Sequence, residues 1–315
     1  MQIIDAERVH ALLPYDQLIP ALVEAHKADI DARASVVLDQ PAASEGVDNF
    51  LALPAWQRGQ ALGAKLVTVF PENETNGSDL PSVQAIYALF DGENGRARAI
   101  IDGTALTLRK TAADSGLGTH FLGPANAKTL LMVGAGAMAP HLIQAHCAAR
   151  PTITDVRIWN RNAARAEALA TSLALPGVTI HVARAIEEVR DADVVSCATM
   201  ATEPLIFGDW LRPGTHVDLV GSFRPDMREC DSATIERGTL YVDSRWSAVE
   251  DCGEIVQALQ TGQISMDDIT ADAFQLSRGE RPGRQVASDV TVYKNGGGGH
   301  LDLMVAQILC ARAGL

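Results

Sequence analysis

The chain has few cysteines, and their arrangement argues against a domain stabilised by disulfides or by a structural zinc ion. Its five cysteines are odd in number and scattered, at positions 147, 197, 230, 252 and 310. No Cys-x-x-Cys pair and no Cys/His spacing typical of zinc occurs, so the sequence supports neither a disulfide framework nor a metal site. We expect buried or half-exposed thiols in a reducing compartment, and therefore a cytoplasmic protein.

Long apolar runs and an excess of positive charge are also missing. No run approaches the roughly 18 apolar residues that span a bilayer, and the N-terminus lacks the basic start and apolar core of a signal peptide. The formal net charge of −13 disfavours nucleic acid or an anionic membrane as a partner. Apart from sparse aromatics, at 5%, the composition is that of a globular enzyme, and 315 residues are enough for two domains.

The first third of the chain predicts an α+β domain. Helical spacing of apolar residues indicates helices over 5–13, 15–32 and 103–122. Between the second and third helix, β-prone runs separated by turn residues indicate strands at 35–38, 49–53, 62–69, 82–91 and 97–101. Strands in direct succession favour an antiparallel or mixed sheet.

From residue 129 the pattern changes to alternating strands and helices, which predicts a doubly wound, mostly parallel sheet. The expected strands are 129–133, 155–159, 178–182, 193–198, 216–220 and 239–243, and the expected helices are 138–150, 162–173, 184–190, 205–210, 232–236 and 247–259. A strand at 290–293, a glycine-rich loop at 294–299 and an apolar helix at 300–313 follow. We therefore predict an α/β Rossmann domain over 119–289, and a second α+β domain over 1–118 that is completed by 290–315.

The segment Thr129–His141, TLLMVGAGAMAPH, predicts a dinucleotide-binding turn. An apolar strand runs into Gly134 and Gly136, and a helical pattern follows. In such turns glycines let backbone amides approach a pyrophosphate at a helix N-terminus, and Ala139 allows the helix to pack closely on the strand. The alternative is an ordinary glycine-containing βα turn.

The end of the next predicted strand bears on the choice of cofactor. NAD-binding domains carry an acidic residue about 20 residues past the glycines, where it binds the ribose hydroxyls. This chain has Asn160 and Arg161 there, with Arg165 one helical turn later. Because arginine binds a phosphate in bidentate fashion, we expect NADPH, with NADH as the alternative. Two solvated arginines at a helix start would produce the same pattern.

With these elements placed, the chain resembles the ornithine cyclodeaminase/mu-crystallin family over almost its whole length. The residues that carry the resemblance are GAKLVTVFP at 63–71, LPSVQ at 80–84, LTLRKTAA at 106–113, VGAGA at 133–137, IWNR at 158–161, VGSFRPD at 220–226 and VYKNG at 292–296. The family includes cyclodeaminases, alanine dehydrogenases, ketimine reductases and a hormone-binding crystallin. The resemblance implies a homodimer, built through the substrate-binding and dimerisation domain at the N-terminus.

The resemblance assigns a substrate-facing lysine to Lys65, which stands in an otherwise apolar, β-prone run. A cation there must snorkel out, pair, or face a polar cavity. The family's next site residue is an arginine, and Lys110 stands in its place, one residue after Arg109. Another arginine of many members is absent, and Gln40 is the candidate substitute. We expect Lys65 and Lys110 to bind a substrate carboxylate.

A departure from the family pattern points to the reaction. Cyclodeaminases and alanine dehydrogenases carry an aspartate two residues after the glycine that ends the fifth strand, where it handles protons. Here Gly221 is followed by Ser222 and Phe223, and phenylalanine cannot transfer a proton. The Gly-Ser-Phe form is similar to that of the ketimine reductases. We expect Phe223 to form an apolar wall over a planar ring, and Asp226 to be an N-cap or first-turn acid ahead of residues 227–231.

The sequence thus predicts an NAD(P)H-dependent reductase of cyclic imino acids, Δ1-pyrroline-2-carboxylate or Δ1-piperideine-2-carboxylate, that forms proline or pipecolate. Lys65 is the expected catalytic residue. The resemblance implies cofactor contacts at Thr111, Gly134, Gly136, Ala137, Met138, Asn160, Arg161, Arg165, Ala198, Thr199, Ser222, Lys294, Gly296 and Gly297. The alternatives are an amino-acid dehydrogenase or cyclodeaminase, and a protein that binds NADPH or another ligand without turnover.

Overall fold

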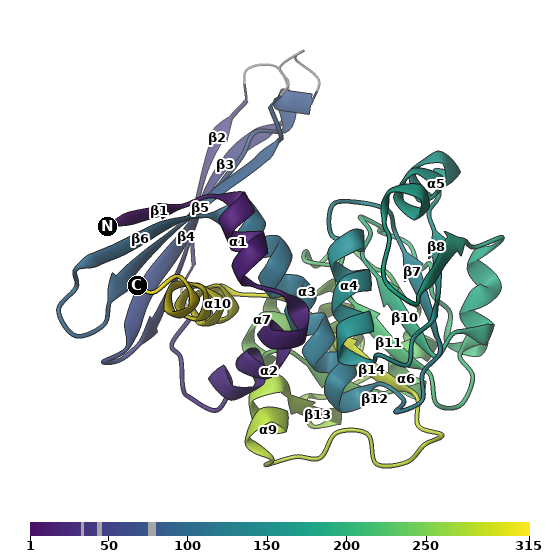
Figure 1. The fold of residues 1–315 in the computed structure, drawn as a ribbon. Coiled ribbons are helices and arrows are strands. Elements are labelled where there is room, and N and C mark those ends of the chain that lie inside the picture. Colours follow the sequence, from purple (N-terminus) through teal and green to yellow (C-terminus); the bar gives the residue numbers. More distant parts are fainter. Residues whose placement is uncertain (33–34, 43–45, 75–79) are drawn as a thin grey trace. The chain divides into compact units, whose positions relative to one another are not determined.

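The computed structural model describes residues 1–32, 35–42, 46–74 and 80–315 (Figure 1). The chain divides into two compact units. Unit 1 comprises Met1–Pro14, Ala28–Lys110 and Gly298–Leu315, and unit 2 comprises Tyr15–Lys27 and Thr111–Gly297. These limits differ from the division expected at 118/119 and 289/290, and residues 15–27 join unit 2 although they lie early in the chain.

Close packing of small residues explains why residues 15–27 and 111–122 join unit 2. Helix α2 (Tyr15–Ala25) contacts α4 (Ala139–Ala149), and α3 (Gly103–Leu122) enters unit 2 at Thr111. A Cβ on Gly116 of α3 would lie 2.5 Å from Ile19, and one on Gly118 would lie 2.6 Å from the ring of Tyr293. Two glycines in one helix thus let it pack closely against both neighbours.

Unit 1 is built on a mixed six-stranded sheet, as expected. Its strand order is β1-β6-β5-β4-β3-β2, with β1 parallel to β6 and every other neighbouring pair antiparallel. The strands are β1 (Gln2–Ile4), β2 (Val36–Pro41), β3 (Val47–Gln57), β4 (Ala61–Val69), β5 (Val83–Asp91) and β6 (Ala97–Asp102). A 3-10 helix, η1, covers Pro71–Glu74. The three-residue β1 was not predicted, because so short a strand shows no alternation.

One face of this sheet is covered and the other is open. Helix α10 (Gly299–Arg312) contacts β3, β4 and β5, and α1 (Ala6–Leu12), capped by Asp5, contacts β6. The covered face carries buried Tyr87 and Ile101. The prediction that the apolar C-terminal helix packs back on the first domain is therefore confirmed.

Unit 2 is built on an eight-stranded, fully parallel sheet with the order β13-β12-β14-β11-β10-β7-β8-β9. The strands are β7 (Thr129–Val133), β8 (Asp155–Trp159), β9 (Thr179–Val182), β10 (Val194–Cys197), β11 (His216–Leu219), β12 (Thr239–Val242), β13 (Ile269–Asp272) and β14 (Thr291–Lys294). From β9 to β11 this is the 3-2-1-4-5 order of the Rossmann fold. The direction of winding reverses between β7 and β10, so ligands are expected beyond the carboxyl ends of these strands.

The helices of unit 2 follow the expected rhythm with local differences. Besides α2, α3 and α4 they are α5 (Ala163–Ser172), α6 (Ser232–Arg237), α7 (Arg245–Asp251), α8 (Gly253–Gln260) and α9 (Ala273–Arg278), with 3-10 helices at Ile186–Asp191, Gly208–Trp210 and Met266–Asp268. The single helix expected over 247–259 is two helices. They are separated by Cys252, which has an extended backbone, and Gly253 packs so tightly against Met227 that a Cβ would overlap its carbonyl oxygen. The short β13 and α9 were not predicted.

Within the described ranges, no helix combines the length and apolar character needed to cross a bilayer. The five cysteines all lie in these ranges and are free thiols. The described residues contain no group of three or more His, Cys, Asp or Glu side chains arranged to hold a metal ion.

Candidate active site

The glycine turn after β7 has the geometry that its sequence predicts. Gly134 has a φ of +113°, and a Cβ there would lie 2.5 Å from the Ala198 carbonyl oxygen, so only glycine fits. Gly136 is exposed, and a Cβ on it would meet nothing within 4 Å. Ala137 is also exposed, and no side chain caps the N-terminus of α4. The turn thus leaves open space beside uncapped helical amides, which is what a phosphate requires.

The polar residues after β8 divide into one that braces the turn and two that face solvent. Asn160 Oδ1 accepts a hydrogen bond from the Ala135 amide at 3.2 Å, and its Nδ2 donates to the Asn162 carbonyl at 2.8 Å. Arg161 and Arg165 are exposed and form no ion pair with any residue in the described ranges. Asn160 therefore holds the glycine turn, and the two guanidinium groups are available for an anion.

A buried carboxylate that sequence reasoning missed joins the loops after β10 and β11. Glu229 Oε1 accepts hydrogen bonds from the Thr199 amide at 2.7 Å and the Thr199 hydroxyl at 2.8 Å, and its Oε2 accepts from the Gly221 amide at 2.7 Å. A Cβ on Gly221 would overlap the Thr199 backbone. Glu229 thus holds two loops together at the carboxyl edge of the sheet, where Rossmann domains bind their ligands.

The environment of Glu229 is a cluster of buried charges. Burial raises the pKa of Glu229 to about 7, and the neighbouring Glu254 carboxylate adds to the increase, whereas the Lys294 ammonium opposes it. Glu254 accepts a hydrogen bond from the Glu229 amide at 2.7 Å, and Lys294 Nζ lies 3.5 Å from Glu254 Oε2. Although burial lowers the pKa of Lys294, the nearby Glu254 carboxylate more than compensates, so this pKa is raised and the ammonium stays charged.

This cluster corrects the expected role of Lys294. Its side chain is completely buried and directed to Glu254, so its ammonium is not available to a cofactor. Only the backbone of this residue remains for such a contact. The lone lysine beside a glycine run gave no signal of its buried partner, because Glu254 lies on a different helix, α8.

The glycine-rich loop after β14 is anchored by side chains of unit 2. The buried Asn295 donates to the Thr111 carbonyl and to Ser115 Oγ, both at 2.9 Å. The Gly297 amide donates to Asp243 Oδ2 at 2.5 Å. A Cβ on Gly296 would lie 2.9 Å from Cys252 Sγ. Residues 295–297 are therefore built into the fold of unit 2.

The segment that replaces the family's aspartate exposes an aromatic ring. Phe223 is 50% exposed, whereas the preceding Ser222 is buried and its hydroxyl bonds the Met227 carbonyl at 3.2 Å and the Gly253 amide at 3.0 Å. Ser222 thus has a structural role in addition to any contact with a cofactor. Asp226 forms an exposed pair with Arg224 at 2.9 Å. No helical residue follows it over 227–231, so the prediction that Asp226 is an N-cap or first-turn acid there was wrong.

In unit 1, Lys65 does not snorkel to solvent. It lies on the covered face of the sheet, with its side chain 10% exposed and its Nζ 2.9 Å from Oδ2 of Asp302 on α10. Asp302 is completely buried. Sequence reasoning missed this aspartate, because nothing in its local pattern distinguishes it from other first-turn helix acids.

The two neighbouring cations of α3 have different environments. Lys110 is buried, whereas Arg109 is half-buried and its Nε donates to Nδ1 of His10 on α1 at 3.0 Å. Arg109 is therefore hydrogen-bonded to a residue of α1. Thr111, the next residue, is half-buried and belongs to unit 2.

Gln40 does not join Lys65. It is exposed on the edge strand β2, in register with Asp48 of β3. Lys65 is in register with Leu53 of β3, five residues further along the strand. Asp48 and Leu53 therefore lie on opposite faces of the sheet. Since side chains alternate along strands, Gln40 points to the open face and Lys65 to the covered one. The expectation that both bind one carboxylate within a single chain is therefore not supported. Ala43, part of the segment compared with the family's arginine, lies outside the described residues.

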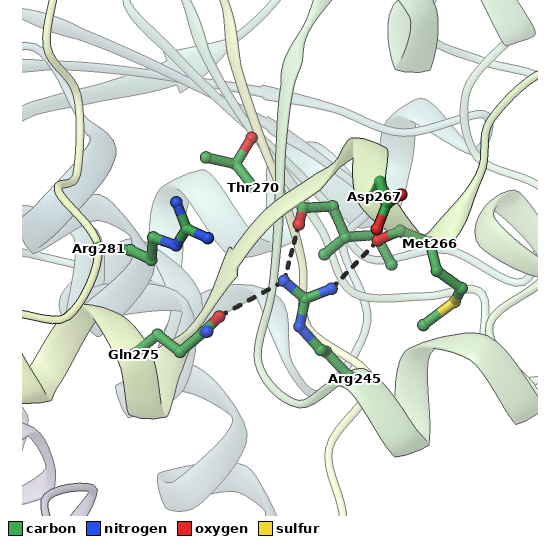
Figure 2. A pocket seen from close by; sticks show the side chains of 7 residues that line it. Arg245, Met266, Asp267, Thr270, Gln275 and Arg281 are labelled. Atoms are coloured by element: carbon green, nitrogen blue, oxygen red, sulfur yellow. Dashed lines mark hydrogen bonds between the residues drawn. The ribbon is translucent and has the colours of Figure 1, made fainter.

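A pocket in unit 2 contains none of the expected site residues. Figure 2 shows its lining residues, Arg245, Met266, Asp267, Ile269, Thr270, Gln275 and Arg281. Arg245 donates to the carbonyl oxygens of Met266 at 3.2 Å and Ile269 at 2.8 Å. Its guanidinium thus braces the segment between α8 and β13, and we assign it no ligand.

The parallel sheet, the glycine turn and the open helix N-terminus define a dinucleotide-binding protein of the Rossmann class. The sequence profile of the Ornithine cyclodeaminase/mu-crystallin family matches residues 3–313, so the chain belongs to this family.

Named relatives agree with this assignment. The chain is 42% identical over 258 residues to a Delta(1)-pyrroline-2-carboxylate reductase of Paracoccus denitrificans, covering 81% of this chain and 80% of the relative. The solved Delta(1)-pyrroline-2-carboxylate reductase of Thermococcus litoralis, in complex with NADH and L-proline, matches with a TM-score of 0.87 and 28% identity over 99% of this chain and 97% of that one. An archaeal alanine dehydrogenase dimer with bound NAD matches with a TM-score of 0.88 and 25% identity over 99% and 95%.

Proposed function

We propose that this protein reduces the C=N bond of cyclic imino acids, Δ1-pyrroline-2-carboxylate or Δ1-piperideine-2-carboxylate, to proline or pipecolate with a nicotinamide dinucleotide. The observation that carries the proposal is the 42% identity to a Delta(1)-pyrroline-2-carboxylate reductase over four fifths of the chain. Phe223 supports it, because the exposed ring stands where deaminating relatives need a proton-transferring aspartate.

The residues of unit 1 account for substrate binding. Lys65 and Lys110 are the cations proposed to bind the carboxylate, and both are largely shielded from water, which strengthens a charge-assisted contact. Phe223 of unit 2 supplies an apolar surface for the flat ring. A bound dinucleotide supplies the hydride, which forms the new C–H bond at the imine carbon. Because protonation of the ring nitrogen makes the imine carbon electrophilic, the protein has to supply this proton, position the ring against the cofactor and exclude water.

The residues of unit 2 account for cofactor binding. Gly134, Gly136, Ala137 and Met138 are proposed to surround the pyrophosphate, and Ala198, Thr199, Ser222, Thr111 and residues 294–297 the nicotinamide end. We infer a preference for NADPH from Arg161 and Arg165, which are exposed with no carboxylate partner in the described ranges. Two solved relatives are in complex with NADH or NAD, so NADH is the competing cofactor.

The open face of the unit 1 sheet supports a homodimer. Six large apolar side chains on this face are exposed: Ile3, Val36, Leu38, Phe50, Trp56 and Ile86. An apolar sheet face of this extent is typical of a protein interface. A second copy is the proposed occupant, since the archaeal alanine dehydrogenase of similar fold is a dimer. Sedimentation of the wild type and of Leu38→Asp tests this, because the charge should convert a dimer to a monomer.

The reaction is tested by following the absorbance of reduced cofactor. Purified protein is incubated with NADPH or NADH and freshly prepared Δ1-pyrroline-2-carboxylate or Δ1-piperideine-2-carboxylate, and the amino-acid product is identified by chiral chromatography. Ornithine and alanine, with oxidised cofactor, serve as alternative substrates. Consumption of cofactor with a cyclic imine and none with the amino acids is the expected result. Turnover of ornithine or alanine alone, or no turnover at all, would overturn the proposal.

A further inference from the structure

We propose that Asp302 is a positioning residue that acts through Lys65. Its buried carboxylate holds the Lys65 ammonium in place, so that this ammonium delivers a proton to the ring nitrogen of the imino acid. The inference rests on the proposed imine reduction. It assigns to Asp302 of α10 a part in proton transfer. In cyclodeaminases and alanine dehydrogenases of the family, this part is expected of the aspartate at the position of Phe223.

Lys65 and Asp302 form a buried ion pair within unit 1. Lys65 Nζ lies 2.9 Å from Asp302 Oδ2, and Asp302 is completely buried. Along β3 and β5, the residues in register with Lys65 are Leu53 and Tyr87, and neither carries a charge at neutral pH. A buried ammonium without a counter-charge favours its neutral form. Asp302 therefore supplies the counter-charge of the Lys65 ammonium.

Tyr87, the ionisable residue in register with Lys65 on β5, does not replace Asp302. Burial and the Asp302 carboxylate raise the pKa of Tyr87 well above its ordinary range, so this residue stays a neutral phenol. Its ring crosses β4 at Gly63, where a Cβ would lie 2.5 Å from the hydroxyl oxygen. The small residue of the Gly63-Ala-Lys65 motif therefore makes room for Tyr87 beside Lys65. His300, two residues before Asp302 on α10, is also buried.

Asp302 retains an oxygen that its ion pair with Lys65 does not use. Neither carboxylate oxygen accepts a hydrogen bond from the described residues, and only Oδ2 is paired, with the Lys65 ammonium. A buried carboxylate oxygen without a donor is costly, and such atoms in enzymes commonly accept from a ligand or an ordered water. This second oxygen is suited to a water that reprotonates Lys65 after turnover.

The proposed step balances in atoms and electrons. An N–H bond of the Lys65 ammonium breaks and an N–H bond forms on the ring nitrogen, while the hydride from the dinucleotide forms the C–H bond at the imine carbon. The imine is reduced, the dinucleotide is oxidised and Lys65 is left neutral. Asp302 stays ionised throughout and favours the return of a proton from water to Lys65.

Asp302→Asn tests the proposal, because it removes the charge and keeps the shape. We expect kcat to fall at least tenfold and the alkaline limb of the kcat profile to move to lower pH, since removing the neighbouring negative charge disfavours an ammonium. KM for the imino acid should change less than threefold. Asp302→Glu should retain the wild-type pH profile at lower kcat. Tyr87→Phe is the matched control and should leave the profile unchanged.

A second readout is independent of turnover. The rate of Lys65 acetylation by acetic anhydride is measured against pH by mass spectrometry, with exposed Lys128 as the internal reference. Asp302→Asn should make Lys65 reactive at lower pH and leave Lys128 unchanged. If the wild type reduces no cyclic imine but this shift occurs, the ion pair stands and the proposed reaction falls. An unchanged Lys65 titration, or an unchanged kcat profile in an active Asp302→Asn protein, would overturn the inference.

Discussion

The Glu229 carboxylate accepts both the amide and the hydroxyl hydrogen of Thr199, at 2.7 and 2.8 Å, from a fully buried position. Thr199 follows β10, at the point where the winding of the parallel sheet reverses. The same carboxylate holds Gly221 after β11. One side chain therefore determines the spacing of two loops that the proposed nicotinamide site requires.

Glu229→Gln should weaken this connection. Both oxygens of a carboxyl group can accept a hydrogen bond, even when it is protonated, whereas an amide nitrogen cannot, so one buried backbone N–H loses its partner. At pH 6 we expect a loss of about 2–4 kcal/mol in the free energy of unfolding and a rise in the KM for the cofactor with little change in that for the imino acid. Urea unfolding and steady-state kinetics measure both. Glu236→Gln, on the exposed side of α6, is the control and should behave as wild type.

The stability contributed by Glu229 should depend on pH. Its pKa is about 7 in the folded protein against 4.5 in the unfolded chain, chiefly because of burial. The folded state thus binds the proton more tightly, and this contribution is complete below about pH 4.5 and lost as the pH rises through 7. The difference corresponds to roughly 3 kcal/mol. We expect the stability of the wild type relative to Glu229→Gln to fall between pH 5 and pH 8; a constant difference would contradict the raised pKa.

The two glycines of the turn should respond differently to alanine. Gly134→Ala places a Cβ 2.5 Å from the Ala198 carbonyl oxygen at a positive φ, so we expect a loss of about 1–3 kcal/mol in folding stability. Gly136→Ala meets open space, so it should melt as wild type and yet bind cofactor at least tenfold more weakly. Thermal melts and cofactor titration separate these effects. Normal cofactor binding by Gly136→Ala would place the pyrophosphate elsewhere.

Arg161→Ala tests the choice of cofactor. If its guanidinium binds the 2′-phosphate, the variant should lose about 1–3 kcal/mol of NADPH binding, which is about 5- to 150-fold, with NADH unaffected. Fluorescence titration with both dinucleotides measures this ratio. Arg184→Ala, another exposed arginine, is the control. Equal losses for both cofactors would contradict a phosphate contact.

Two variants separate the effect of Lys65 on folding stability from its effect on turnover. Lys65→Met leaves the buried Asp302 carboxylate unpaired, which should cost about 3–5 kcal/mol, whereas adding Asp302→Leu should restore most of this stability. Neither protein should turn over a cyclic imine at more than about 1% of the wild-type rate, because both lack the ammonium. Calorimetry and the cofactor assay report the two properties. Near-normal turnover by the double variant would remove Lys65 from the reaction.

Much of the fold could be predicted because its strongest signals are local. The helix at Gly103–Leu122 and the strands at Thr129–Val133 and Asp155–Trp159 have the predicted bounds, since their periodicity is long or bounded by turn residues. The break at Cys252 could not be predicted, because it accompanies the packing of Gly253 against Met227 of a distant loop. The short β1 and β13 exist only through pairing with distant strands.

The residues of the candidate site show the same difference between local signals and contacts of distant segments. Gly134 could be identified from sequence, because a left-handed turn between a strand and a helix needs glycine locally. Glu229 and Asp302 could not, because an acid is distinguished from its surface neighbours only by burial and by its partner. Conversely, Lys294 looked accessible in sequence and proved to be buried against Glu254.

The sequence by itself determined the class of fold, the dinucleotide turn and the family, because backbone conformation and strand or helix periodicity depend on residues close together in the chain. Only the tertiary structure decided which charges meet: Lys65 with Asp302, Lys294 with Glu254, and Glu229 with two loop amides. The physical reason is that the ionisation of a buried group depends on its solvation and its nearest charge, and folding sets both by bringing distant segments together.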